Sequence, residues 1–161
     1  MKTNEQLCAV LNLDESEPQL MPLTKRRAVA ALPFGSRYRL IDFPLSSLYS
    51  AEVTSVALFV RGSARALLDH VRSGYPWGME STVGGGLFIH SGAEIKEALE
   101  SLEPGQISSY YQDQIDFVQH SKKGYVVVMG SKMLCNVDVK GVLRSHLANE
   151  ADITIVYKNV S

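Results

Sequence analysis

The chain has 161 residues, 45% of them hydrophobic and 20% charged, which is typical of one ordinary globular domain. Its formal net charge of −1 gives no electrostatic reason to expect binding to nucleic acid or to an anionic membrane. No apolar run approaches the roughly 18 residues that span a membrane, and the polar start lacks a signal peptide's apolar core. The two cysteines, Cys8 and Cys135, show no zinc-ligand spacing. We therefore expect a cytoplasmic protein with reduced cysteines.

The first half of the chain predicts two buried strands and two helices. Apolar runs over 7–13 and 54–60 have the length and composition of buried strands. Between them we expect a loop over 14–36, long enough to be functional, and a short helix over 44–50. A second helix is expected after an N-cap at Ser63, with a buried face made of Ala64, Leu67, Leu68 and Val71.

The second half continues the alternation of strands and helices. In chain order it predicts a turn over 73–78, an irregular strand over 83–90, helices over 92–102 and 106–120, a central parallel strand over 125–129, a helix from Asp138 and a last strand over 151–157. This alternation predicts an α/β fold with a mostly parallel central sheet flanked by helices. Because no closing helix follows the last strand, we expect the chain to be part of something longer.

Two polar clusters have a structural and a functional interpretation. The glycines at 84–86 precede a strand rather than a helix, so they predict a turn or bulge and not a phosphate loop. The cations Lys25, Arg26, Arg27, Arg37 and Arg39 form either a solvated face or an anion site. The four histidines are scattered and predict no metal site.

The strand over 125–129 ends where ligands sit in open parallel sheets. A metal-dependent phosphoryl or nucleotidyl enzyme would place an aspartate here to hold Mg²⁺. The chain has Ser131 and Lys132 instead, and a hydroxyl beside an ammonium does not hold a divalent cation.

The 23–46 segment, with its LTKRRA, PFG and YRLIDFPLS motifs, resembles the sugar-phosphate nucleotidyltransferases, and most closely the ADP-glucose pyrophosphorylases. Further similarity lies in GYPW at 74–77, in the stretch from Gly105 to Phe117, and in the 125–130 strand. The resemblance implies a Rossmann-like, GT-A-like nucleotidyltransferase sandwich, here truncated. Residues 1–161 would be the N-terminal part of that domain, without the family's C-terminal β-helix domain.

The departures from this family fall on positions that handle phosphate and metal. The family's glycine-rich first loop is replaced by Asp14 to Leu20, with Gln19 in place of an arginine that polarises the phosphates. The family's Mg²⁺-binding aspartate aligns with Ser131, and a lysine aligns with Val29. The resemblance therefore implies no catalytic residue, no metal ligand and no bound cofactor on this chain.

This pattern resembles the GlgD-type regulatory subunits, which keep the scaffold and assemble with a GlgC-type catalytic subunit. It implies a catalytically impaired subunit of glucose-1-phosphate adenylyltransferase in bacterial glycogen biosynthesis, with a sugar-phosphate or nucleotide effector. The candidate nucleotide- or anion-binding residues are Arg27, Arg37, Arg39, Trp77, Gly105 and Gln112. Two alternatives stay open: an active sugar-phosphate nucleotidyltransferase of altered design, and a non-enzymatic sugar-phosphate or nucleotide sensor.

Overall fold

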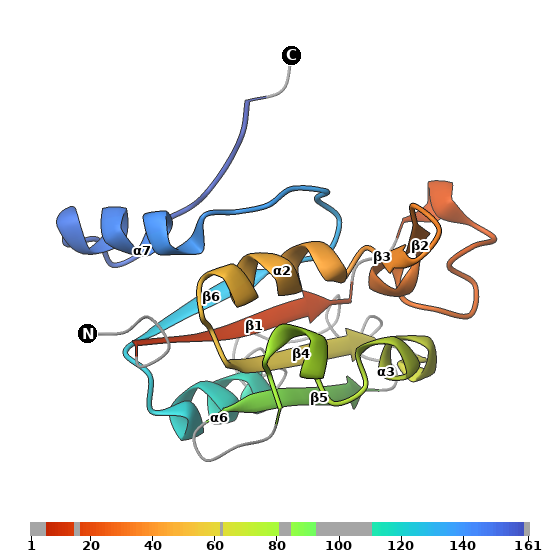
Figure 1. Cartoon of the computed structure of the whole chain (residues 1–161), viewed down its shortest axis with the longest axis horizontal. Helices are drawn as coiled ribbons and strands as arrows, with labels where there is room; N and C mark the ends of the chain where they lie inside the picture. The colour runs from red at the N-terminus through yellow and green to blue at the C-terminus, as the bar shows by residue number, and fades with distance from the viewer. Residues whose placement is uncertain (1–5, 15–16, 62, 81–84, 93–110, 160–161) are drawn as a thin grey trace, which may run out of the picture.

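The computed structural model describes residues 6–14, 17–61, 63–80, 85–92 and 111–159 (Figure 1). In chain order, its elements are β1 (Leu7–Leu13), η1 (Pro18–Leu20), η2 (Val29–Ala31), β2 (Pro33–Phe34), β3 (Tyr38–Arg39), α2 (Asp42–Ser50), β4 (Ser55–Arg61), α3 (Arg65–Val71), η3 (Tyr75–Trp77), β5 (Gly86–Gly92), α6 (Gln112–Ser121), β6 (Tyr125–Met129) and α7 (Val139–Ala148). None of the helices in this part of the chain is long and apolar enough to cross a membrane.

Four parallel strands form the central sheet in the order β5-β4-β1-β6. On one side of β1, Leu11 lies opposite Leu58 of β4, and on the other side it lies opposite Met129 of β6. Because every strand runs the same way, their carboxyl ends meet at one edge, where the arrowheads point in Figure 1. The predicted α/β fold with a parallel sheet is confirmed.

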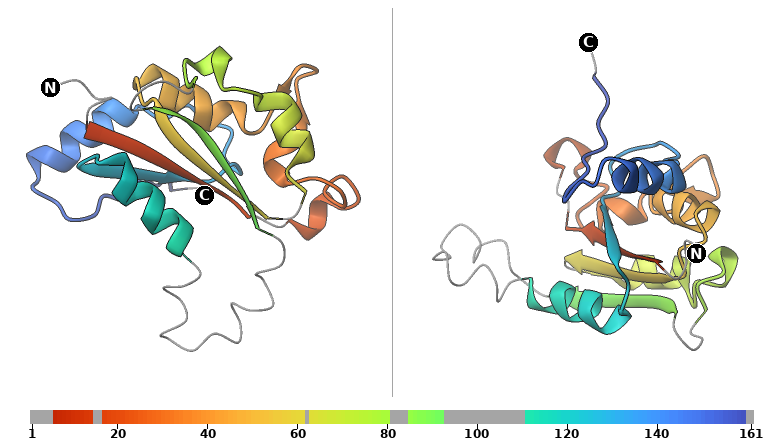
Figure 2. Two further views of the ribbon diagram at one scale, coloured as in Figure 1. Left: turned by 90° about the horizontal axis from the view of Figure 1, so that it is seen from below. Right: turned by 90° about the vertical axis from the view of Figure 1, so that its left-hand side faces the viewer.

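Helices cover the two faces of the sheet unequally. Figure 2 shows α2, α3 and α7 on one face and α6 on the other. The main core lies under the first group, because alternate residues of β1 point that way and pack with the apolar faces of α2 and α3. Its largest fully buried side chains include Leu11, Leu13, Ile41, Leu45, Leu48, Leu58 and Leu67. Cys8, in β1, is a free, buried cysteine, and burial raises the pKa of its thiol.

Two local predictions need correction around α3 and β5. The predicted N-cap Ser63 lies outside α3, which begins after Ala64 without a side-chain cap, and Leu68 is 46% exposed rather than buried. The predicted irregular strand is a regular one, paired with β4 from Gly86 onward. Gly85, just before it, lies so near β4 that an added Cβ would be 3.1 Å from the carbonyl oxygen of Thr54.

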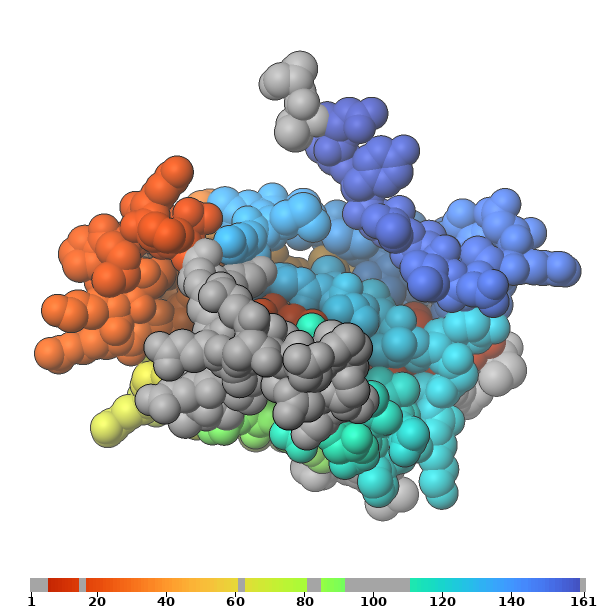
Figure 3. All heavy atoms as spheres, turned by 180° about the vertical axis from the view of Figure 1, so that it is seen from behind, coloured from red at the N-terminus to blue at the C-terminus, as the bar shows by residue number. Residues whose placement is uncertain are grey.

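Two predictions about the end of the chain were wrong. In the described sheet the strand over 125–129 is the edge strand β6 rather than a central one, because β4 and β1 take the two inner places, and Val128 is 60% exposed. Residues 151–157 form no strand, since no neighbouring strand pairs with them, and Ile153 and Tyr157 stay exposed. Figure 3 shows this segment rising away from the face that carries α6 and β6. The predicted helix over 92–102 lies essentially outside the described residues.

A buried hydroxyl fixes the loop that follows β6. Ser47 of α2 is fully buried. Its Oγ lies 3.1 Å from the carbonyl oxygen of Phe43 and 3.0 Å from Oδ1 of Asn136, and its single proton can be donated to either of them. The same oxygen accepts a hydrogen bond from the backbone N–H of Val137 at 3.0 Å. The 130–138 loop is therefore held against α2 at its far end.

Asp42, the first residue of α2, joins the β2–β3 hairpin to α3. Its Oδ2 accepts a hydrogen bond from the backbone N–H of Arg39 at 3.0 Å, and its Oδ1 lies 2.7 Å from Nε2 of His70. Both side chains are largely buried, 12% exposed for Asp42 and 21% for His70. The Nη1 of Arg39 in turn donates to the carbonyl oxygen of Ala31 at 2.6 Å. These contacts hold the hairpin, η2 and α3 in one fixed arrangement.

We predict that Ser47→Ala lowers the free energy of unfolding by about 1–3 kcal/mol, because it leaves the partly buried N–H of Val137 without its acceptor. Urea unfolding of the purified chain measures this loss. Ser46→Ala is the matched control, since Ser46 is the exposed neighbour on the same helix and its loss should cost less than about 0.5 kcal/mol. Equal unfolding midpoints for the two variants would contradict the assigned role.

We predict that Asp42→Ala lowers the free energy of unfolding by about 1–3 kcal/mol, because Arg39 and His70 both lose an acceptor. Asp42→Asn should cost less, since its amide oxygen still accepts one of the two hydrogen bonds. Thermal and urea unfolding should both give the highest stability for the wild type, a lower one for Asp42→Asn and the lowest for Asp42→Ala. A wild-type midpoint in Asp42→Ala would show that the contacts carry no net stability.

Candidate functional site

The strand order places a topological switch point between β1 and β6. From β1 the chain moves outward through β4 to β5, and it then returns to the opposite side of β1 to form β6. In open α/β sheets, ligands bind outside the carboxyl ends of the strands where the order reverses. The loops that follow β1 and β6 are therefore the walls of the candidate site.

An ion pair joins these two loops. Nζ of Lys132, in the loop after β6, lies 3.4 Å from Oε2 of Glu17, in the loop after β1. The two side chains are 45% and 34% exposed, so the pair lies at the surface of the sheet edge. Ser131, beside Lys132, is fully buried. Positive and negative charge are thus already matched across the switch point.

The end of β6 does not suit Mg²⁺. A magnesium site would use carboxylate oxygens, whereas Ser131 offers a hydroxyl and Lys132 an ammonium that repels a cation. The carboxylate of Glu17 is paired with that ammonium. Among the described residues, no group of three or more His, Cys, Asp or Glu side chains is arranged to hold a metal ion.

The loop after β1 carries its departures from the nucleotidyltransferase pattern in two different environments. Gln19 lies exposed on η1. Val29 is 3% exposed on η2, inside an apolar cluster with Ala30 and Ala31, where a lysine would lose its hydration. The segment therefore buries this position, and η2 as a whole packs against α3.

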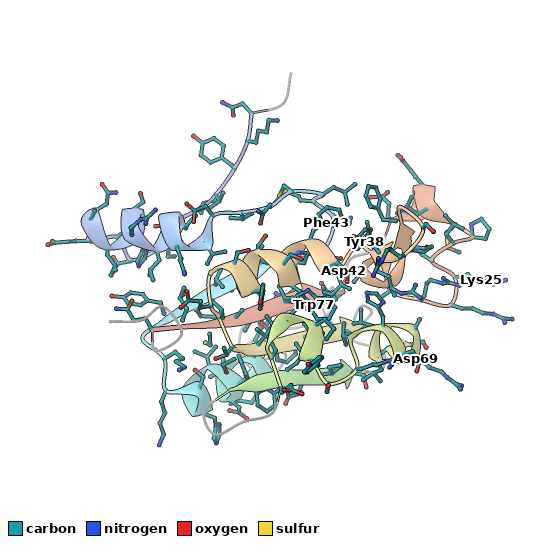
Figure 4. All side chains as sticks on the ribbon, in the orientation of Figure 1. Lys25, Tyr38, Asp42, Phe43, Asp69 and Trp77 are labelled. Atoms are coloured by element: carbon teal, nitrogen blue, oxygen red, sulfur yellow. The ribbon has the colours of Figure 1, made fainter. Side chains whose placement is uncertain are left out.

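The three candidate arginines differ in what they contact. Arg27 and Arg37 are exposed, and the guanidinium of Arg37 lies 5.7 Å from the centre of the Tyr38 ring, a cation–π contact. Arg39 is partly buried and bonds to Ala31, so its side chain supports the backbone. Figure 4 shows Tyr38, Asp42 and Phe43 gathered where the hairpin meets α2, and Lys25 at the outer rim.

The structure does not bring the other candidates to the arginines as one cluster. Trp77 is partly buried in η3, where its ring centre lies 6.3 Å from that of His70. Gln112 opens α6, across the sheet from α2, and its Nε2 donates to Oδ1 of Asp116 at 2.6 Å (Figure 2). Gly105 lies outside the described residues. The assignment of all six to ligand binding stays a prediction.

Three contacts at this edge were not predicted from the sequence. They are the pairs Asp42–His70, Ser47–Val137 and Glu17–Lys132, and their members are 28, 90 and 115 positions apart. The polar pattern gave no signal for the first two. The third could have been found by noticing an acid after one strand and a lysine after its parallel neighbour, once the strand order was known.

Comparison with known proteins places this geometry in a family. Residues 17–161 match the family model described as Nucleotidyl transferase. A protein described as glycogen biosynthesis protein GlgD, from Geobacillus stearothermophilus, is 33% identical over 151 residues, covering 94% of this chain and 43% of that protein. The protein of the same description from Bacillus subtilis strain 168 is 32% identical, covering 97% and 44%. The chain thus spans less than half the length of these curated relatives.

More distant matches agree with this placement. A glucose-1-phosphate adenylyltransferase of Thermodesulfovibrio yellowstonii is 26% identical, covering 89% of this chain and 34% of that protein. In structure, the chain resembles a protein described as a glucose-1-phosphate thymidylyltransferase from Bacillus anthracis, solved with sucrose. The TM-score is 0.60 at 14% identity, covering 88% of this chain and 50% of that one, which supports the fold alone. Because the family model matches most of its length, the chain belongs to the nucleotidyl transferase family.

Proposed function

We propose that this chain is part of a GlgD-type regulatory subunit of glucose-1-phosphate adenylyltransferase, with no catalysis of its own. In this role it assembles with a GlgC-type catalytic subunit in bacterial glycogen biosynthesis and raises that subunit's production of ADP-glucose. The similarity to two proteins described as GlgD supports the choice within the family.

The observation that carries the proposal is the charge arrangement at the switch point. An active nucleotidyltransferase needs its cations directed at the triphosphate and a carboxylate at the metal. Here Lys132 pairs with Glu17, Ser131 is buried, and Val29 lies in the core. The loss of a single strong electrostatic contact typically costs about two to three orders of magnitude in rate, so several losses together leave little activity.

The proposal includes a partner and an effector but no metal. We infer that the chain binds no Mg²⁺ through the end of β6, since Ser131 and Lys132 do not suit it. The exposed arginines Arg27 and Arg37 are the candidates for contact with an anionic effector or with the catalytic subunit.

We predict that the purified protein alone makes no ADP-glucose above background from ATP, glucose 1-phosphate and Mg²⁺. Added to its GlgC-type catalytic subunit, it should raise the rate of pyrophosphate release per catalytic subunit. Steady-state assays at varied subunit ratios measure this, with the catalytic subunit alone and with added serum albumin as controls.

Three outcomes would contradict the proposal in different ways. ADP-glucose formation by the chain alone at rates similar to those of a catalytic subunit would indicate an active enzyme of altered design. Binding of a sugar phosphate or nucleotide without association with the catalytic subunit would indicate a sensor. Association with the catalytic subunit without any change in its rate of pyrophosphate release would contradict the proposed regulatory role.

We predict that Arg27→Ala and Arg37→Ala reduce the stimulation of the catalytic subunit while changing the free energy of unfolding by less than about 0.5 kcal/mol. Arg39→Ala should instead lower the free energy of unfolding by about 1–3 kcal/mol, since its guanidinium bonds to the buried Ala31 segment. Urea unfolding and the mixed-subunit assay separate the two effects. Full stimulation by both exposed-arginine variants would exclude them from the functional surface.

A further inference from the structure

The pair formed by Glu17 and Lys132 occupies the place where this fold type receives ligands. β1 and β6 are parallel neighbours, with Leu11 opposite Met129, so the loops that follow them leave the same edge side by side. The ion pair crosses from one loop to the other, between elements 115 positions apart in the sequence. It therefore closes the gap between the walls of the switch point.

Lys132 is held in place by the structure on both sides of it. Ser131 before it is fully buried, and the far end of the same loop is bonded to Ser47 of α2 through Asn136 and Val137. A cation in a loop anchored at both ends, at the carboxyl edge of a parallel sheet, has the charge and the place to contact a phosphate group. The carboxylate of Glu17 now fills that contact.

The pair is weak enough to exchange partners. Ion pairs between exposed side chains are screened by water and ions, and they contribute little to stability. A phosphate with two or more negative charges competes well against one carboxylate for the same ammonium. The contact can therefore open when such an anion is present, without unfolding of either loop.

We propose that Glu17 is a built-in competitor for anions at Lys132, so that a phosphate-bearing ligand contacts this edge only by displacing the Glu17 carboxylate. The proposal deepens the proposed function, on which it rests, by naming the contact that regulates ligand access at the switch point. The ligand class is a multiply charged phosphate, free or carried by a metabolite.

The test is a double-mutant cycle on pyrophosphate binding. Isothermal titration calorimetry at low ionic strength compares the wild-type chain with E17Q, K132Q and the E17Q/K132Q double variant. We expect E17Q to bind pyrophosphate about two- to fivefold tighter than wild type, the range that an exposed ion pair can supply. K132Q should bind pyrophosphate several-fold more weakly than wild type. The E17Q/K132Q double variant should bind it no more tightly than K132Q alone.

A second ion pair of the chain supplies the control for net charge. Nζ of Lys140 in α7 lies 2.7 Å from Oε1 of Glu52, a surface pair that does not join the β1 and β6 loops. E52Q removes the same charge as E17Q and should leave the affinity for pyrophosphate unchanged. Thermal unfolding of each variant confirms that all are folded.

Several results would overturn the proposal. If E17Q raised the affinity for pyrophosphate equally in the wild-type and K132Q backgrounds, Glu17 would act only by general repulsion of the anion. An equal gain from E52Q, an unchanged affinity in K132Q, or no pyrophosphate binding by any variant would also contradict it. These measurements use the chain alone, so their failure is separate from a failure of the mixed-subunit assay, which tests the regulatory role.

Discussion

The structure depends on one constraint, the parallel pairing of β1 along both of its edges. β1 is buried on both faces, and its residues lie opposite β4 on one side and β6 on the other. A strand in this position needs a nearly continuous apolar run, which LCAVLNL provides. The same pairing decides which loops meet at the carboxyl edge, so the core and the candidate site share one cause.

The 23–46 segment, which resembles the family's motif, is held together by contacts within the chain. The 23–46 segment folds through contacts that need no ligand: Arg39 to Ala31, Asp42 to Arg39, and Asp42 to His70. These contacts preserve the shape that the family motif encodes. The charges at the switch point, by contrast, satisfy one another. The fold of this segment therefore does not require a bound ligand, and its function has to be argued from the site rather than from the scaffold.

The sequence predicted what is encoded locally. Strand β1, helix α2 and the start of helix α7 near Asp138 follow from patterns of a few residues. The structure adds that Oδ1 of Asp138 caps α7 by accepting from the backbone N–H of Gly141. The position of β6 at the sheet edge could not be predicted, because strand order depends on contacts between distant segments. For the same reason, the hydrogen-bond partner of His70 could not be predicted from the sequence.

The structure gives the places of the residues that the sequence assigned to a candidate site, and their role in ligand binding stays a prediction. Ser131 and Lys132 were placed after the carboxyl end of a parallel strand, and they follow β6 there. Arg39 was grouped with Arg27 and Arg37 because the chain brings them close in sequence, yet its guanidinium turns to a backbone carbonyl. Composition counts charges, whereas burial and hydrogen bonding decide which charges remain available to a ligand.

The exposed segment after α7 has a consequence for how the chain behaves at high concentration. Its run of β-branched and aromatic residues, with Ile153 80% and Ile155 77% exposed, has the composition of segments that stack into intermolecular sheets. Asp152 and Lys158 bracket this run with opposite charges. Flanking charges of this kind act as gatekeepers, since stacking identical segments in register would bring like charges together. Asp152 and Lys158 thus oppose self-association of this segment, although neither residue belongs to the core.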